Sequence, residues 1–339
     1  MSTIAHLQVQ LPSANDEDFP TIILTQRVLE KIFAASMQHV QHETGEAMVG
    51  VALPNGKQKL PKLYIMDTIS PVGDAIRQWG MFEQGDDWQG AIFNWWHENW
   101  EMYREWRRGS YGNAIAAKWD APLLHLGDWH KQPDGMIRPS GGDMRTAKRL
   151  MKEEDLPYLL MPIVTFDTET GPLEEANALA IATRDQRLRI DFWWVARRGN
   201  TFDPVHPILE PDGTIPRLPP VVWWLADSAR FDIELAALEL EGLEVMDIIS
   251  WSENGRPPLD TCFIIYRPGH SDVIIACTPF DYPAKPARWR KAPIVRPGED
   301  DDFFQAIYRE SEKIAPAKLV GWRPDMLMVD IVRMIEEQA

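Results

Sequence analysis

Apolar residues in the first part of the chain change between strand-like and helical spacing. The apolar run 21–24 predicts a short strand, and Thr25 after it suits the N-cap of a helix. Apolar residues recur at helical spacing in that helix, at Val28, Leu29, Ile32, Phe33 and Met37. The runs 47–53 and 63–69 are strand-like and are separated by the turn signal Pro54-Asn55-Gly56. They predict a β-hairpin or a meander.

The spacing becomes helical again between Trp88 and Trp106. One broad face carries Ile92, Trp95, Trp96, Trp100, Tyr103 and Trp106, and the other carries Glu98, Glu101, Arg104 and Arg107. A helix so rich in tryptophan must pack against a large surface. We expect core packing against the sheet; the alternative is an aromatic wall beside a binding groove.

Strands and a helix alternate after this segment. The apolar strand 122–127 leads into a polar segment, and Ser140 suits the N-cap of a helix that carries Asp143 in its first turn. Further strands are predicted at 158–166, 176–183 and 188–195. With the polar leader 1–19 set aside, these elements predict an α/β domain over 20–199.

A proline-rich segment divides the chain. Residues 200–220 contain Pro204, Pro207, Pro211, Pro216, Pro219 and Pro220. Because prolines at this density disfavour a regular element, we interpret the segment as a linker between two domains. The second domain, 221–339, contains a predicted helix at 228–240, strands at 244–251, 260–266 and 272–278, and a closing helix at 324–337. The predicted fold class is α/β (α+β).

Charge and cysteine content narrow the range of functions. The chain has 35 Lys plus Arg against 51 Asp plus Glu, a net charge of −16, which repels phosphate backbones and anionic lipid headgroups. We therefore expect no nucleic-acid partner and no membrane partner. Cys262 and Cys277 are its two cysteines, and the N-terminal residues lack the layout of a signal peptide. This predicts a cytoplasmic protein with reduced thiols.

Residues of metal-ligand type cluster in one stretch, His125-Leu-Gly-Asp-Trp-His130-Lys-Gln-Pro133, followed by Pro139-Ser140-Gly-Gly-Asp143. With the upstream segment Glu43-Thr-Gly45-Glu46, this stretch resembles the JAMM (MPN/JAB) family of zinc-dependent isopeptidases. The pattern of that family is a Glu in E-T-G-G-x-L-x-G, then W-H-x-H-P, then P-S-x-x-D. The chain keeps Glu43, Trp129, His130, Pro133, Ser140 and Asp143. It has Gln132 in place of the second histidine and Glu46 in place of a glycine.

The resemblance implies a role for each of these residues. Zinc (Zn²⁺) would be held by His130 and Asp143, with Gln132 as a poor third ligand, because zinc favours nitrogen, sulfur and charged oxygen donors. Glu43 would be the general base and Ser140 the oxyanion donor, while Trp129 and Pro133 would contribute to binding.

Strand periodicity places positions 130 and 132 on one face. His125 is an odd number of residues from His130, so it would lie on the opposite face unless a bulge intervenes.

The second domain resembles the ubiquitin-conjugating-enzyme (UBC/RWD) fold. The matching features are the helix 230–238, a three-strand meander, the Tyr282-Pro283 and Pro286 positions of a Y-P-x-x-P element, and Trp322. The catalytic cysteine of that family follows this element, but no cysteine follows Cys277 here. The resemblance therefore implies a non-catalytic variant.

These resemblances lead to contrasting functional hypotheses. The first is a bacterial zinc-dependent isopeptidase that deconjugates a ubiquitin-like protein or processes its C-terminus by metal-activated water. The second is a JAMM pseudoenzyme, impaired by Gln132, that binds or scaffolds components of a ubiquitin-like pathway. A third is a structural protein unrelated to that pathway. The expected partners are a ubiquitin-like protein or its conjugate and conjugation enzymes, and bound zinc would separate the first two hypotheses.

Overall fold

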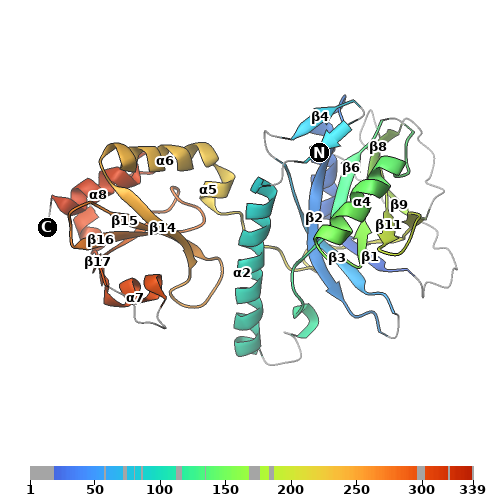
Figure 1. The fold of residues 1–339 in the computed structure, drawn as a ribbon. Coiled ribbons are helices and arrows are strands. Elements are labelled where there is room, and N and C mark those ends of the chain that lie inside the picture. Colours follow the sequence, from blue (N-terminus) through green and yellow to red (C-terminus); the bar gives the residue numbers. More distant parts are fainter. Residues whose placement is uncertain are drawn as a thin grey trace. The chain divides into compact units, whose positions relative to one another are not determined.

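The computed structural model describes residues 19–56, 59–71, 75–79, 81–84, 87–111, 117–133, 135–167, 176–182, 187–295, 302–319 and 321–337. The chain divides into two compact units, 1–218 and 219–339. Each unit combines helices with a β-sheet, so the α+β class is confirmed (Figure 1). The predicted leader, except for its last residue, lies outside the described residues. No helix among the described residues combines the length and the apolar character needed to cross a membrane.

The first unit is built on one large mixed sheet. Its strands are β1 Thr21–Thr25, β2 Thr44–Leu53, β3 Lys62–Ile69, β6 Leu124–Lys131, β7 Tyr158–Leu160, β8 Ile163–Asp167, β9 Ala178–Ala182, β10 Arg187–Asp191, β11 Trp193–Ala196, β12 Asp203–Pro204 and β13 Pro207–Glu210. They run in the order β12-β11-β7-β6-β2-β3-β1-β13, and β8 joins β6 to β10, which pairs with β9. The β2–β3 hairpin is confirmed as antiparallel. A small hairpin, β4 Ile76–Gln78 and β5 Met81–Glu83, stands apart.

Helices cover both faces of this sheet. Helix α1, Gln26–Gln38, buries Val28, Leu29, Ile32 and Phe33 in a core with Met48, Trp129 and Leu160. Helix α4, Gly141–Glu153, buries Ala147 and Met151 in a second core with Ile163 and Val195. The central strand β6 therefore has one layer of helix on each side.

The tryptophan-rich helix α2 spans Asp87–Tyr111. Its Trp95, Trp96 and Trp100 are buried, and Trp100 Nε1 donates a 2.8 Å hydrogen bond to Ala121 O. At its N-terminal end, Gln89 Nε2 donates to Ile69 O of β3 at 2.7 Å. These contacts favour core packing over an aromatic wall beside a groove.

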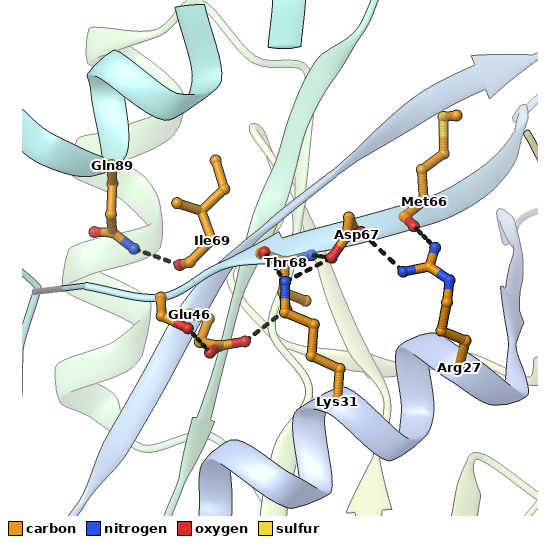
Figure 2. A network of polar contacts seen from close by, with 9 residues as sticks. Arg27, Lys31, Glu46, Met66, Asp67, Thr68, Ile69 and Gln89 are labelled. Carbon is orange, nitrogen blue, oxygen red and sulfur yellow. Dashed lines mark hydrogen bonds and ion pairs between the residues drawn. The ribbon is translucent and has the colours of Figure 1, made fainter. Parts of the chain in front are cut away.

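A polar network joins α1, β2 and β3 (Figure 2). Asp67 pairs with Arg27 at 2.8 Å and Lys31 at 2.7 Å, and these cations lower its pKa against the opposing effect of burial. Glu46 is buried and accepts hydrogen bonds from the hydroxyls of Thr68, at 2.6 Å, and Ser70. The carboxylate at position 46 thus lies within the fold.

The proline-rich segment 200–220 was predicted to lack regular elements, and that prediction was wrong. Its strand β12 pairs with β11, and β13 pairs in parallel with β1, from Ile22–Pro207 to Thr25–Glu210. Proline is tolerated here because β13 is an edge strand and Pro207 is its first residue. Most of the predicted linker therefore belongs to the first unit.

The second unit contains an antiparallel sheet in the order β14-β15-β16-β17-β18. Its strands are β14 Glu244–Trp251, β15 Asp260–Tyr266, β16 Asp272–Thr278, β17 Arg288–Pro293 and β18 Glu312–Lys313. Its helices are α5 Trp223–Ala226, α6 Ser228–Leu240, α7 Phe303–Glu310 and α8 Met328–Glu336. Helix α7 packs on the face that carries Cys262 and Cys277, which are buried free thiols; α6 and α8 lie on the other side (Figure 1).

One buried carboxylate connects three parts of the second unit. Glu234 of α6 has no exposed side-chain surface and pairs with Arg230 at 2.8 Å. It also accepts hydrogen bonds from the Tyr282 hydroxyl at 2.9 Å and from Met328 N of α8 at 2.6 Å. Its partners lie on α6 itself, in the segment that contains Tyr282 and at the start of α8. This carboxylate therefore fixes α8 against α6.

Candidate functional site

The candidate site begins where β2 and β6 lie side by side. Gly45 is in register with His130, and Glu46 is in register with Trp129. A Cβ atom at position 45 would lie 2.3 Å from Trp129 O and 3.0 Å from the His130 Cβ. Only glycine allows this approach. The close packing of β2 against β6 therefore explains the glycine of the Glu43-Thr-Gly45 motif.

His130, Gln132 and Asp143 converge as strand periodicity and the α4 cap predict. Gln132 Nε2 lies 3.0 Å from His130 Nε2 and 3.2 Å from Asp143 Oδ2, and His130 Nε2 lies 3.5 Å from Asp143 Oδ1. Burial lowers the pKa of His130 and outweighs the opposing carboxylates Asp143 and Asp128. The neutral imidazole of His130 can therefore accept a hydrogen bond from the Gln132 amide at its Nε2 atom.

The amide orientation of Gln132 follows from this network. Its nitrogen has two hydrogens, one for His130 and one for the Asp143 carboxylate, whereas an amide oxygen in that place would face a carboxylate oxygen. Its Oε1 is buried and has no hydrogen-bond partner. We call His130, Gln132 and Asp143 the amide-bridged cluster.

Ser140 and Asp143 also form the N-terminal cap of α4. Ser140 Oγ accepts hydrogen bonds from Gly142 N at 3.1 Å and Asp143 N at 3.3 Å, and Asp143 Oδ2 accepts one from Ser140 N. This reciprocal capping box anchors the first turn of α4 above β6. Both side chains thus have a structural role that is independent of any reaction.

The residues of the cluster do not fit a catalytic zinc site. Such a site uses three protein ligands of histidine, carboxylate or thiolate type. His130 and Asp143 are of these types, but Gln132 turns its donor nitrogen toward both of them. In the described part of the chain, no group of three or more His, Cys, Asp or Glu side chains is arranged to hold a metal ion.

Glu43 stands beside this cluster, immediately before β2. Burial raises its pKa to about 7, the nearby Asp143 carboxylate adds to the rise, and Lys131 opposes it. Its backbone N donates a 2.8 Å hydrogen bond to Gln78 O of the small hairpin. A carboxyl group with this pKa can exchange a proton near neutral pH.

Glu43 opens onto a groove of about 780 Å³, which we call the Glu43 groove. It is lined by Val40, Gln41, His42, Glu43, Arg77, Gln78, Trp79, Lys131, Gln132, Pro133, Met136 and Phe166. Pro133 thus lies in the lining of this groove. Trp79 is 71% exposed, and Met136 and Val40 are also exposed, so the rim is apolar.

Sequence reasoning missed most of this lining. Arg77, Gln78 and Trp79 come from the small hairpin, and Phe166 comes from β8. No periodic pattern links these segments to the central motif. The available signal was an isolated tryptophan, Trp79, in a segment without helical or strand periodicity.

Trp129 was predicted as a binding residue, but it lies elsewhere. Its side chain is fully buried in the core under α1, on the sheet face opposite His130. The alternation of side chains along a strand explains this placement, because neighbouring residues point to opposite faces.

His125 lies on the same strand face as His130 because the β2–β6 register shifts between Met48 and Val49. It does not join the amide-bridged cluster. Its Nε2 lies 3.0 Å from Asp128 Oδ1, and its Nδ1 lies 2.8 Å from Glu154 Oε2. Burial lowers the pKa of His125, but these two carboxylates outweigh it and raise the pKa to about 10. We call this arrangement the His125 clamp.

Comparisons with known proteins give little further information. No family model matches the chain, and no curated protein matches it. Among solved structures, the chain resembles the solution structure of protein DSY2949 from Desulfitobacterium hafniense at 16% identity and a TM-score of 0.30. The match covers 57% of this chain and 94% of that one.

Proposed function

We propose that the protein is a non-catalytic, JAMM-like binding module that recognises a ubiquitin-like protein or its conjugate. The amide-bridged cluster carries this proposal. In it, the Gln132 amide nitrogen occupies the position between His130 and Asp143 and uses both of its hydrogens there. The His130 ring nitrogen and the Asp143 carboxylate therefore have hydrogen-bond partners within the protein itself.

The Glu43 groove supports a binding role. Its rim exposes Trp79, Met136 and Val40, and exposed apolar side chains grouped around a groove are typical of protein-recognition surfaces. Arg77 and Glu43 line the groove and are partly exposed, so it offers a cationic and an acidic group to an extended polypeptide. These features suit a protein ligand better than a small apolar molecule.

The second unit supports the same pathway by resemblance. Its helix, antiparallel meander and closing helix follow the order expected for a UBC-like domain. The cysteines Cys262 and Cys277 both precede the Tyr282-Pro283 element and are buried. We infer that this unit cannot form a thioester and acts as a second binding module.

The first experiment measures metal content by elemental analysis after purification with added zinc. We expect equal zinc in the native protein and in His130→Ala. Gln132→His should gain about one zinc per chain, because it completes a three-ligand set, and Asp143→Ala in that background should lose it. The proposal would be overturned if the native protein contained about one zinc per chain and the His130→Ala variant lost it.

A second experiment tests binding with fluorescently labelled ubiquitin and a panel of ubiquitin-like proteins. We expect saturable binding by at least one of them, weakened about tenfold or more by Trp79→Ser, since exposed tryptophans are common hot spots. Ile208→Ser is the matched control, because Ile208 is also an exposed apolar residue but lies on β13. Equal losses in both variants, or no saturable binding to any member, would contradict a role for the groove.

The alternative is an active isopeptidase, and Glu43 favours it. A half-buried carboxyl group with a pKa of about 7 is suited to act as a general base at neutral pH. Under this alternative the native protein cleaves a ubiquitin-like conjugate, and Glu43→Gln abolishes cleavage without loss of binding. Under the binding proposal the conjugate remains intact with both the native protein and the Glu43→Gln variant.

A further inference from the structure

Helix α6 of the second unit carries apolar side chains on two opposite faces, although its inner face also includes a buried carboxylate. Its inner face buries Glu234 and Leu238 against the unit. Its outer face carries Ala229, Ile233, Ala236 and Leu240, which follow one another at intervals of four, three and four residues. This spacing aligns them in one stripe along the helix.

This outer stripe is open to solvent. Leu240 is 90% exposed and Ile233 is 53% exposed, and both alanines are exposed as well. Surface helices in globular proteins normally present polar residues on the outer face, and a helix that is apolar all round is normally buried. An exposed leucine by itself needs no explanation, but an aligned stripe indicates a surface that another molecule covers.

Acidic side chains border the stripe along one side. Asp232 and Glu239 are exposed and, being seven residues apart, project from the same side of the helix about two turns from each other. Among the described residues, no ion pair neutralises either carboxylate. The negative border therefore remains available to a positively charged partner.

The charge of the whole chain narrows the choice of occupant. A second copy would bring together two chains of net charge −16, which is unfavourable. An anionic membrane would be repelled by Asp232 and Glu239 in the same way. A helix from another protein, with an apolar face and Lys or Arg along one edge, matches both the stripe and its border.

We propose that the α6 stripe, Ala229, Ile233, Ala236 and Leu240, is a docking surface for a basic amphipathic helix of a partner protein. Helix α6 has 13 residues, so it offers roughly 20 Å, or between three and four turns, to that partner. The acidic border fixes the orientation of the docked helix, and the apolar stripe contributes most of the affinity.

The test uses the full-length protein and a labelled synthetic helix. The probe peptide carries leucines at helical spacing on one face and lysines along one edge; a second peptide replaces each lysine with glutamate. Fluorescence anisotropy should give saturable 1:1 binding of the lysine peptide and at least tenfold weaker binding of the glutamate peptide. Far-UV circular dichroism checks that every protein variant keeps its fold.

Substitutions locate the binding surface. Ile233→Asn combined with Leu240→Asn should weaken binding of the lysine peptide by about tenfold or more. Met37→Asn is the matched control, because Met37 is an exposed apolar residue on a helix of the first unit. Asp232→Lys combined with Glu239→Lys should reverse the preference between the peptides.

The outcomes separate the proposal from its rivals. No saturable binding, or binding that the α6 substitutions leave unchanged, would overturn the proposal. Analytical ultracentrifugation tests for self-association. If the native protein is a dimer and Leu240→Asn is a monomer, a second copy of the chain occupies the stripe and the proposed partner is wrong.

Discussion

The His125 clamp predicts that the free energy of unfolding of the first unit falls as the pH becomes alkaline. His125 bridges Asp128 on its own strand and Glu154 at the end of α4. Its pKa in the folded protein is about 10, above its ordinary value of 6.5. Because the pKa is raised on folding, the stabilisation is fully present below about pH 6.5 and is lost as the pH rises toward 10.

The size of this effect follows from the pKa change. A rise of this extent corresponds to roughly 5 kcal/mol of unfolding free energy, a large part of the stability of an ordinary domain. The His125→Asn variant keeps a polar side chain but cannot carry the positive charge. Its stability should therefore be lower than that of the native protein near pH 6 and should approach it near pH 10.

Urea unfolding followed by circular dichroism, at pH values from about 6 to about 10, measures this difference. The difference between native and His125→Asn curves isolates the clamp from other titrating groups. His270→Asn is the control, because His270 is an exposed histidine of the second unit. A native-minus-variant difference that is constant across this pH range would refute the reasoning.

Further predictions concern packing and buried charge. Glu234→Gln should destabilise the second unit by about 3–5 kcal/mol in thermal or urea unfolding, because it leaves Arg230 without its buried partner, whereas the exposed Glu239→Gln should change stability little. Gly45→Ala should prevent native β2–β6 pairing, because the new Cβ meets Trp129 O; normal expression and an unchanged melting temperature would contradict this. Gly90→Ala should raise stability by about 0.5–1 kcal/mol, since Gly90 lies within α2 and nothing surrounds its missing Cβ.

Elements with strong periodicity and clear end signals were predictable from the sequence. Helix α4 begins at the Ser140 cap, and β14, β15 and β16 match their predicted ranges. The central strands β15 and β16 are short continuous apolar runs, which is the pattern of strands buried on both faces. Helix α6 was predictable despite its apolar outer face. By contrast, β17 and α7 have short or charged patterns, and their strand and helix states depend on tertiary contacts.

The candidate site was predictable in part. Positions 130 and 132 share a strand face, and Asp143 projects from the first turn of α4, so these residues meet as expected. The face occupied by His125 depends on the register shift between Met48 and Val49 opposite β6, which the apolar pattern does not reveal. The rest of the Glu43 groove comes from distant segments, and only the folded chain brings them together.

The pairing of β1 with β13 affects how the chain folds during synthesis. The first strand leaves the ribosome early, but its neighbour β13 is made much later; the nearby Arg27–Asp212 hydrogen bond joins residues 185 positions apart. At ordinary elongation rates this interval lasts on the order of ten seconds. Throughout it, one edge of β1 has no strand partner and can pair with other nascent chains. We therefore expect that a chain ending before β13 would be prone to aggregation, so the proline-rich segment also protects the newly made protein.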